Sequence, residues 1–334
     1  MSGHTGARHL DVLGLTASIS GWPEIVDDVG RDFAWFERPE VARPAVSVVV
    51  EQRRPDYGQF GRLPASFVTP RNVVYQRGDT TIVDFFGRVM SVLDRTTGRL
   101  LIQGEDAAIV HEAAYLFLLS RIGEHLDALG LPRLHALGLS GRQGAVAVML
   151  PSGGGKSTLA LHALKEDGMR LLSEDSPLLD RQGRLHPFPL RIGINAVDAA
   201  LLPSDQVRRI ERMEFHPKLA LDLNAFRDRI EREPQPLRHL VIGRRTLGPV
   251  SALVPVSRSM AMSPLLRELV VGVGLYQGME YVLQRGMRDV IGKLGVAAMR
   301  AERAATALRR VRVWQLVIGH DLDRNWAELR RLLT

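Results

Sequence analysis

The chain has 334 residues, of which 45% are hydrophobic and 24% are charged. This length and composition are enough for a sizeable buried core in one or two domains, so a disordered chain is excluded. Cysteine is absent, which excludes disulfide bonds, thiol nucleophiles and thiolate metal ligands and is typical of a cytoplasmic protein in a reducing compartment.

The charge balance favours anionic partners. The formal net charge of +7 suits nucleotides, acidic peptides or nucleic acid, but no helix-turn-helix, RNP aromatic motif or zinc knuckle indicates a specific nucleic-acid interface. The most apolar segment, residues 265–283, contains Arg267, Glu268, Gln277 and Glu280, and a charged residue costs about 3 kcal/mol at the centre of a bilayer. We therefore predict a buried helix there and no membrane association; the amino terminus also lacks the apolar core of a signal peptide.

The first part of the chain is rich in strand patterns. Residues 44–104 consist of short alternating runs broken by Arg-Gly-Asp and Thr-Thr-Gly turns, which is typical of antiparallel strands and hairpins. Residues 106–129 have apolar residues at helical spacing and are followed by Gly130, a helix stop. We predict a β-rich amino-terminal domain over residues 1–104, with the helix leading into a second domain over residues 105–334.

The second domain is predicted to alternate strands and helices. A strand at 134–140, the turn Gly-Arg-Gln-Gly and a buried strand at 145–150 lead into a glycine-rich loop, and a helix follows from Lys156 to Gly168. The next strand, 169–175, ends in two carboxylates. The remaining elements are expected to be a hairpin at 176–194, strands within 237–256, helices within 264–295, a strand at 311–319 and a closing helix at 323–333.

The glycine-rich loop matches a phosphate-binding pattern. The sequence Leu-Pro-Ser-Gly-Gly-Gly-Lys-Ser-Thr from Leu150 fits G-x-x-x-x-G-K-[ST] except at its first position, where leucine replaces glycine. A buried strand before the loop and a helix that begins at Lys156 direct several backbone N–H groups toward one anion. The predicted phosphate-binding residues are Ser152, Gly153, Gly154, Gly155, Lys156, Ser157 and Thr158.

Within this loop, Lys156 is expected to reach the β- and γ-phosphates of a nucleotide, and Ser157 to place its hydroxyl on Mg²⁺. The backbone must approach phosphate at Gly153 to Gly155, whereas the first position mainly shapes the exit from the strand. We therefore expect Leu150 to alter the entry into the loop more than its capacity to bind phosphate. The alternative interpretation is a glycine-rich turn that only imitates such a loop.

Two further features flank the loop at defined spacing. His135 lies fifteen residues before Leu150, and the pair Glu174-Asp175 ends the strand after the helix. With these features the passage 134–175 resembles the HPr serine kinase family, which is related to ATP-dependent phosphoenolpyruvate carboxykinases. The resemblance implies an α/β fold with a P-loop kinase core of the HPr kinase and carboxykinase type, the cofactors ATP and Mg²⁺, and a tendency to form homo-oligomers.

The resemblance also implies roles for individual side chains. Asp175 would accept the proton of the acceptor hydroxyl, Glu174 would bind the metal or its water, and His135 would contact phosphate or the acidic pair. The expected metal ligands are Ser157, Glu174 and Asp175, and which carboxylate is the base and which the metal ligand is left open. Arg191, in the segment Phe-Pro-Leu-Arg-Ile-Gly-Ile-Asn, would contact a phosphate or the transition state.

The acidic pair and the histidine also have simpler interpretations. Neighbouring residues of a strand point to opposite faces, so Glu174 and Asp175 reach one site only if the strand ends at Ser173 or Glu174. Otherwise the pair is a solvated strand end. The simpler interpretation of His135 is a partly buried strand histidine with a hydrogen-bond partner.

Other polar residues are weaker candidates. Lys218 could contact a phosphate, but a surface position on a strand explains it as well. His186 and His216 stand beside prolines with no second ligand at metal-site spacing, so no zinc site is predicted. The basic run at 302–313 is interpreted as the solvated face of a helix.

The departures from the family pattern indicate a branch with another phosphate acceptor. Leu150 replaces the glycine, Glu174 stands where the family has aspartate, and Thr158 stands where HPr kinases have glutamate. Three passages, residues 173–180, 186–194 and 270–283, resemble enzymes associated with lasso peptides. We therefore expect Mg-ATP-dependent phosphorylation of a hydroxyl, most simply a serine of a peptide or small protein. The alternatives are a small-molecule kinase and a nucleotide-binding regulatory or scaffold protein without transfer activity.

Overall fold

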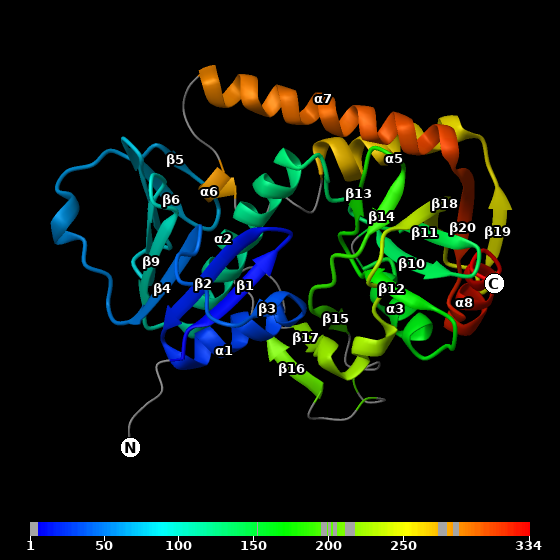
Figure 1. The fold of residues 1–334 in the computed structure, drawn as a ribbon, viewed down its shortest axis with the longest axis horizontal. Coiled ribbons are helices and arrows are strands. Elements are labelled where there is room, and N and C mark those ends of the chain that lie inside the picture. The colour runs from blue at the N-terminus through cyan, green and yellow to red at the C-terminus, as the bar shows by residue number, and fades with distance from the viewer. Residues whose placement is uncertain are drawn as a thin grey trace. The chain divides into compact units, whose positions relative to one another are not determined.

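The computed structural model describes residues 6–151, 153–194, 199, 202, 206–210, 218–272, 279–282 and 287–334 (Figure 1). It shows a mixed α/β protein with several sheets. The chain divides into two compact units. Unit 1 comprises Met1–His125, Pro203–Asp222 and Gln277–Gln284, and unit 2 comprises Leu126–Leu202, Leu223–Tyr276 and Arg285–Thr334. The expected border at 104/105 precedes a helix, whereas the structural division falls within that helix and two later segments belong to unit 1.

Unit 1 is built on a nine-stranded sheet in the order β3-β1-β2-β4-β9-β8-β7-β6-β5. Its strands are β1 (Arg8–Val12), β2 (Leu15–Gly21), β3 (Glu37–Arg38), β4 (Val46–Gln52), β5 (Phe67–Val68), β6 (Val73–Arg77), β7 (Thr80–Asp84), β8 (Val89–Asp94) and β9 (Arg99–Gly104). β4 pairs in parallel with β2 and β9, and the other pairs are antiparallel. The hairpins expected within 44–104 are confirmed, while the β1–β2 hairpin was not predicted.

The helices of unit 1 and an antiparallel pair of strands outside the nine-stranded sheet complete this unit. They are α1 (Pro23–Asp32), the 3₁₀ helices η1 (Ala34–Phe36) and η2 (Gly58–Phe60), α2 (Ala107–Ala128), α6 (Met279–Val282), and the antiparallel pair of β16 (Val207–Ile210) with β17 (Lys218–Leu221). Helix α2 confirms the helix expected at 106–129. Tyr281 anchors α6, because its ring is fully buried, its hydroxyl lies 3.0 Å from Ser91 Oγ, and its carbonyl accepts a hydrogen bond from Arg121 at 2.8 Å.

The apolar segment 265–283 is not the single buried helix that its sequence predicts. α5 (Met262–Leu265) and the π-helix η6 (Leu266–Val271) belong to unit 2 and end at Gly272, whose φ is +72°. Leu266 and Val271 are 47% and 49% exposed. The chain then passes to α6 of unit 1; residues 273–278 and 283 lie outside the described residues. Among the described helices, none has the length and hydropathy needed to span a membrane.

Unit 2 contains a mixed sheet with the main path β12-β10-β11-β18-β14-β13, to which β20 is joined through β18 and β19 through β20. Its strands are β10 (Leu137–Gly141), β11 (Gly144–Met149), β12 (Arg170–Ser173), β13 (Leu178–Leu179), β14 (Arg184–His186), β18 (Gln235–Arg245), β19 (Ala252–Pro255) and β20 (Arg312–Ile318), and the short β15 (Ile192–Ile194) lies outside this sheet. β11, β18 and β20 run parallel, so their carboxyl ends meet at one edge.

Helices pack on this sheet and close its core. They are α3 (Lys156–Leu164), the 3₁₀ helices η4 (Leu223–Arg229) and η5 (Arg258–Ala261), α5, η6, α7 (Met287–Arg310) and α8 (Leu322–Arg330). Leu265, Leu269, Ala304 and Ala307 from α5, η6 and α7 join the buried side chains of the strands in one core. The predicted turn at residues 141–144, the helix beginning at Lys156 and the late strands of this unit are confirmed.

Candidate functional site

The glycine-rich loop leaves β11 at the carboxyl edge of the sheet and leads directly into α3. Gly153 and Gly155 have φ values of +72° and +103°, a backbone conformation that favours glycine, and a Cβ added at either would meet no atom within 4 Å. Gly155 caps α3, whose first hydrogen bond runs from Leu159 N to Gly155 O at 3.0 Å. The first turn of α3, whose N–H groups have no acceptor within the helix, therefore begins directly at the loop.

Leu150, the departure from the loop pattern, fits against a glycine of the neighbouring strand. It follows Met149, whose partner in parallel β18 is Ile242, so Leu150 stands opposite Gly243. The Leu150 side chain is buried, and a Cβ added at Gly243 would lie 1.9 Å from Leu150 Cδ2. The absence of a side chain at Gly243 therefore makes room for Leu150.

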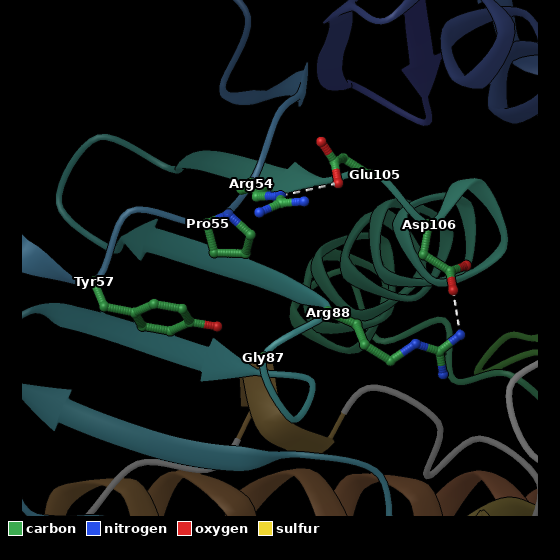
Figure 2. A pocket seen from close by; sticks show the side chains of 7 residues that line it. All are labelled: Arg54, Pro55, Tyr57, Gly87, Arg88, Glu105 and Asp106. Carbon is green, nitrogen blue, oxygen red and sulfur yellow. Dashed lines mark hydrogen bonds and ion pairs between the residues drawn. The ribbon is translucent and has the colours of Figure 1, made fainter.

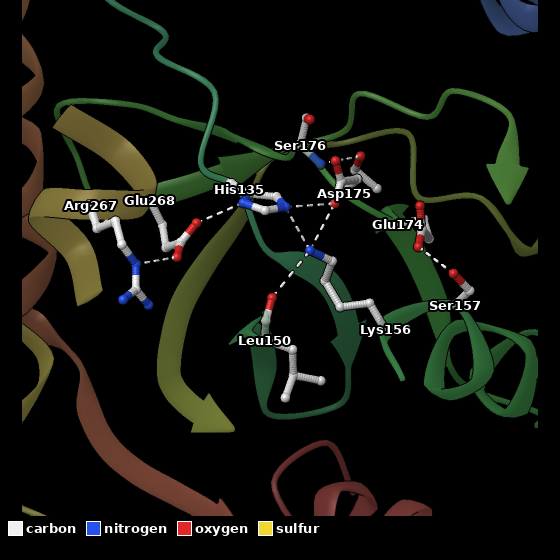
Figure 3. A network of polar contacts seen from close by, with 10 residues as sticks. His135, Leu150, Lys156, Ser157, Glu174, Asp175, Ser176, Arg267 and Glu268 are labelled. Atoms are coloured by element: carbon white, nitrogen blue, oxygen red, sulfur yellow. Dashed lines mark hydrogen bonds and ion pairs between the residues drawn. The ribbon is translucent and has the colours of Figure 1, made fainter. Parts of the chain in front are cut away.

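Lys156 is the centre of the polar network drawn in Figure 3. Its Nζ lies 2.9 Å from Asp175 Oδ1, 2.7 Å from His135 Nε2 and 3.3 Å from the carbonyl oxygen of Leu150. The side chain is 8% exposed, and a buried ammonium requires such partners because it has lost its hydration. The structure thus brings together His135, Lys156 and Asp175, which are up to forty residues apart in the sequence.

Backbone hydrogen bonds hold His135 in place from two sides. Leu134 N donates to Pro177 O at 2.9 Å and Ala136 N donates to Asp175 O at 3.2 Å, while His135 N donates to the carbonyl oxygen of Glu268 at 3.0 Å. The imidazole lies between two carboxylates. Nδ1 is 2.6 Å from Glu268 Oε2, and Nε2 is 3.1 Å from Asp175 Oδ1.

These carboxylates shift the pKa values within the network. Burial lowers the pKa of His135, but hydrogen bonds to Asp175 and Glu268 more than offset it and raise the pKa to about 9. Burial raises the pKa of Asp175, yet its hydrogen bond to His135 and the charge of Lys156 hold that pKa below its usual value. The pKa of Glu268 is likewise lowered, because bonds to His135 and Arg267 outweigh burial. At neutral pH both carboxylates are ionised.

Two arrangements of protons fit the distances around His135. A protonated imidazole donates from Nδ1 to Glu268 and from Nε2 to Asp175, which agrees with the raised pKa. A neutral imidazole donates from Nδ1 to Glu268 and accepts at Nε2 from Lys156, which agrees with the 2.7 Å distance because two protonated nitrogens would repel there. In both arrangements Nδ1 carries a proton and donates it to Glu268.

The acidic pair diverges from the end of β12. The strand ends at Ser173, and Ser173 Oγ accepts a hydrogen bond from Ser176 N at 3.0 Å as the chain bends. Glu174 Oε1 then accepts a hydrogen bond from Ser157 Oγ at 2.6 Å, while the Asp175 carboxylate turns to Lys156 (Figure 3). The strand therefore ends where both carboxylates can reach the loop. The side-chain oxygens of Ser157 and Glu174 thus lie together at the start of α3, as candidate metal ligands.

The remaining predicted site residues are Thr158, Gly154, Arg191 and Ser152. Thr158 is buried in the first turn of α3, and Gly154 N donates to Pro151 O at 2.9 Å. Arg191 is half-buried and directly precedes β15, which packs against α3. Ser152 lies outside the described residues.

Two of the weaker candidates, Lys218 and His186, lie on strands β17 and β14. Lys218 begins β17, which belongs to unit 1 rather than to the unit that carries the loop. His186 Nε2 lies 2.9 Å from Asp180 Oδ2 within the β13–β14 hairpin, and His216 is outside the described residues. In the part of the chain that the structure describes, no three His, Asp or Glu side chains are grouped to hold a metal ion.

Three residues beside the loop were not predicted from the sequence. Glu268 and Arg267 reach the network from η6, with Arg267 Nε 2.8 Å from Glu268 Oε1. Arg245, at the end of β18, donates from Nη1 to the carbonyl oxygen of Gly153 at 3.2 Å. The chain position of Arg245 could have indicated it, because β18 is parallel to β11 and both strands end at one edge. No local pattern marks Glu268, which is far from His135 in sequence.

A polar pocket of about 600 Å³ lies in unit 1 (Figure 2). Its charged side chains are paired within the pocket: Arg54 Nε is 3.5 Å from Glu105 Oε2, and Arg88 forms an ion pair with Asp106. Tyr57 donates to Asp84 at 2.8 Å, and burial together with this bond raises its pKa. Opposite charges compensate one another here, so the pocket offers no group prepared for proton or phosphoryl transfer.

No model of a known protein family matches the chain, and a search of curated proteins finds no significant relative.

Proposed function

We propose that the chain is a Mg-ATP-dependent kinase that transfers the γ-phosphoryl group of ATP to a hydroxyl, most simply a serine of a peptide or small protein. The observation that carries the proposal is the 2.9 Å contact between Lys156 Nζ and Asp175 Oδ1, beside the 2.6 Å contact between Ser157 and Glu174. A phosphate-binding lysine, a candidate proton acceptor and two candidate metal ligands thus share one loop edge. These contacts support a P-loop kinase core.

The loop fits the phosphates of a nucleotide. Gly153 and Gly155 present backbone without side chains, and the amino end of α3 favours negative charge through its N–H groups and dipole. Lys156 would neutralise the β- and γ-phosphates. Arg245, which already touches the loop at Gly153 O, adds a second cationic side chain at its rim.

Ser157 and Glu174 fit Mg²⁺ by their chemistry. This ion prefers oxygen ligands and keeps several waters, so that one or two protein carboxylates together with substrate phosphates are sufficient. When bound, the ion would neutralise charge on the phosphate oxygens. Glu174 has its carboxylate 2.6 Å from the Ser157 hydroxyl, and Asp175 is the next residue. We assign Glu174 as the metal ligand and Asp175 as the base.

The protein's own groups would then act by position and charge. Asp175 is ionised at neutral pH and 44% exposed, so it can accept the proton of an approaching hydroxyl. The acceptor oxygen forms its bond to the γ-phosphorus while the bond from that phosphorus to the bridging oxygen of ADP breaks. Lys156 would balance the charge on the phosphates. His135, whose Nε2 lies 3.1 Å from Asp175 Oδ1, would hold the Asp175 carboxylate beside Lys156.

Two features of the sequence bear on the identity of the phosphate acceptor. Replacement of the family's glutamate by Thr158 and the similarity to enzymes associated with lasso peptides favour a peptide serine. A small-molecule kinase is the alternative within the same chemistry, and a scaffold that binds nucleotide without transfer is the alternative outside it.

The test is incubation of the purified chain with labelled ATP, Mg²⁺ and either serine-containing peptides or a metabolite pool, with products identified by mass spectrometry. A phosphorylated peptide that is lost in Asp175→Asn supports the proposal. A phosphorylated metabolite moves the acceptor to small molecules. Nucleotide binding without any transfer favours the scaffold, and unchanged ATP binding by Lys156→Ala would refute the phosphate loop itself.

A further inference from the structure

Glu268 is a buried carboxylate whose two oxygens are both engaged. Its side chain is 7% exposed, and its Oε2 lies 2.6 Å from His135 Nδ1 while its Oε1 lies 2.8 Å from Arg267 Nε. A buried carboxylate is costly unless it is paired and hydrogen-bonded, so the geometry of these partners is strongly constrained. The residue stands 133 positions after the histidine in the sequence.

The element that carries Glu268 is itself unusual. It is a π-helix, Leu266–Val271, in which Gly272 N donates to Arg267 O at 2.8 Å, five residues back. Such wide turns are rare and occur often at functional sites. Here the turn lets one residue hold His135 twice, through the side chain at Nδ1 and through the Glu268 carbonyl at His135 N.

This double attachment decides which edge of the imidazole faces the loop. With Nδ1 directed to Glu268, Nε2 points to Lys156 and Asp175 at 2.7 Å and 3.1 Å. The hydrogen bond made by one ring nitrogen of a histidine sets the proton on the other. Without Glu268, the ring could turn over, or Nδ1 could lose its proton so that Nε2 carries the only one.

We propose that Glu268 is a positioning residue of this site, which holds the His135 ring with Nδ1 protonated and Nε2 turned toward Lys156 and Asp175. The importance of that orientation for transfer rests on the proposed kinase function; the orientation itself does not. Arg267 extends the arrangement, because its Nε donates to the second carboxylate oxygen, Oε1, at 2.8 Å.

Glu268→Gln tests this by replacing one carboxylate oxygen with an NH₂ group. Because Arg267 donates to one oxygen of Glu268, the amide carbonyl would face Arg267 and the amide NH₂ would face His135 Nδ1. Nδ1 would then become an acceptor and the imidazole proton would move to Nε2. Exchange of a carboxylate for an amide beside a catalytic histidine is known to reverse its tautomer in this way.

Nuclear magnetic resonance of ¹⁵N-histidine-labelled protein measures directly whether His135 Nδ1 is protonated. The His135 signals are assigned by comparison with His135→Gln. We expect a protonated Nδ1 in the parent protein and an unprotonated Nδ1 in Glu268→Gln. In the double variant Arg267→Ala/Glu268→Gln the amide is free to turn, so a protonated Nδ1 should return. An unprotonated Nδ1 in the parent protein, or an unchanged Nδ1 in Glu268→Gln, would overturn the proposal.

Kinetics supply the second readout. Glu268→Gln should lower kcat at least about 10-fold with the KM for ATP changed less than about threefold, because a supporting residue acts through His135 and not on the nucleotide. Glu280→Gln is the matched control, since Glu280 is also 5% exposed but belongs to unit 1, and it should leave kcat and the His135 signals unchanged.

The two readouts separate this inference from the proposed function. A reversed His135 tautomer in a chain that transfers phosphate to no acceptor would retain Glu268 as the orienting group and refute the kinase. Phosphate transfer with an unchanged kcat in Glu268→Gln would retain the kinase and refute the importance of Glu268 for transfer. Thermal unfolding of each variant confirms that the compared proteins are folded.

Discussion

Each unit contains a buried pair of histidine and carboxylate, and the two pairs differ in their surroundings. In unit 1, His111 Nε2 lies 2.9 Å from Asp32 Oδ2, and the Asp32 side chain is 0% exposed. Arg208 also pairs with Asp32 and lies 3.2 Å from Asp28 Oδ1. The charges of this group are compensated inside the unit, and the arrangement ties β16 to α1 and α2.

The pair in unit 2 continues toward an exposed group. His135 and Glu268 make the same kind of bond, but the other ring nitrogen faces Lys156 and Asp175, and the Asp175 side chain is 44% exposed. The same bond thus stabilises a closed core in one unit and supports a carboxylate accessible to solvent in the other. We expect substitutions in the first pair to change stability and substitutions in the second to change activity.

The largest contrast is expected from Asp175→Asn. The amide cannot accept the hydroxyl proton, so the rate of phosphate transfer should fall about 10³-fold, within the range for loss of a general base. The variant should also be less stable, because Asp175 pairs with the buried Lys156 and with His135, so the rates are compared for the folded protein. Initial rates with ATP and a peptide acceptor measure the effect, and Asp323→Asn, at a side chain that is 94% exposed, is the control. A full rate in Asp175→Asn would remove the distinction between the two pairs.

Asp32→Ala tests the opposite side of the comparison. Removal of this carboxylate leaves Arg208 and His111 buried without their common partner, so unfolding should become easier by about 3 kcal/mol. The affinity of the folded protein for ADP should stay within twofold. Denaturant unfolding and calorimetric titration measure the two quantities. The neighbouring Asp27→Ala, at a 63% exposed ion pair, should cost less than about 1 kcal/mol. Weaker ADP binding by folded Asp32→Ala would contradict a purely stabilising role.

The pH dependence of stability is expected to reflect the His135 group. The pKa of His135 is raised to about 9 in the folded protein, against about 6.5 in an unfolded chain. Its contribution is therefore complete below about pH 6.5 and is lost as the pH rises through 9. This amounts to up to about 3 kcal/mol. Urea unfolding at pH 6 to 10 should show the loss in the parent protein and a flatter profile in His135→Gln. Equal slopes in both would contradict it.

Much of unit 2 could be predicted from the sequence because its signals are local. The turn at 141–144, the loop, the start of α3 and the end of β12 each depend on residues that are neighbours in the chain. The family resemblance, which rests on the spacing of His135 and Asp175 around the loop, also predicted that they share a site. The structure brings both residues within hydrogen-bonding distance of Lys156.

The remainder depends on contacts between distant segments. Nothing near Glu268 indicates that its carboxylate binds His135. Hydropathy alone predicted one buried helix over 265–283, although η6 ends before Gly272 and α6 belongs to unit 1. Leu150 was read against a pattern for its own loop, whereas its fit is decided by Gly243, ninety-three residues later. Periodicity reports which face of an element is apolar but does not identify what packs against it.

The last expected effect is the coupling between Leu150 and Gly243. Gly243→Val would place its side chain on Leu150 Cδ2, so it should destabilise by about 1–3 kcal/mol through overpacking. Leu150→Ala alone should cost about 2–5 kcal/mol because it leaves a cavity. The double variant Leu150→Ala/Gly243→Val roughly conserves the side-chain volume, so it should be more stable than the sum of the single changes implies.

A double-mutant cycle by denaturant unfolding gives the coupling, which we expect to be favourable by about 1–3 kcal/mol. Nucleotide affinity supplies the comparison with the site. If the loop keeps its glycine conformation independently of its entry, the double variant should bind ADP like the parent protein. Restored stability with lost ADP binding would instead mean that leucine at this position shapes the phosphate loop itself, so that the packing of unit 2 and its site could not be treated as separate.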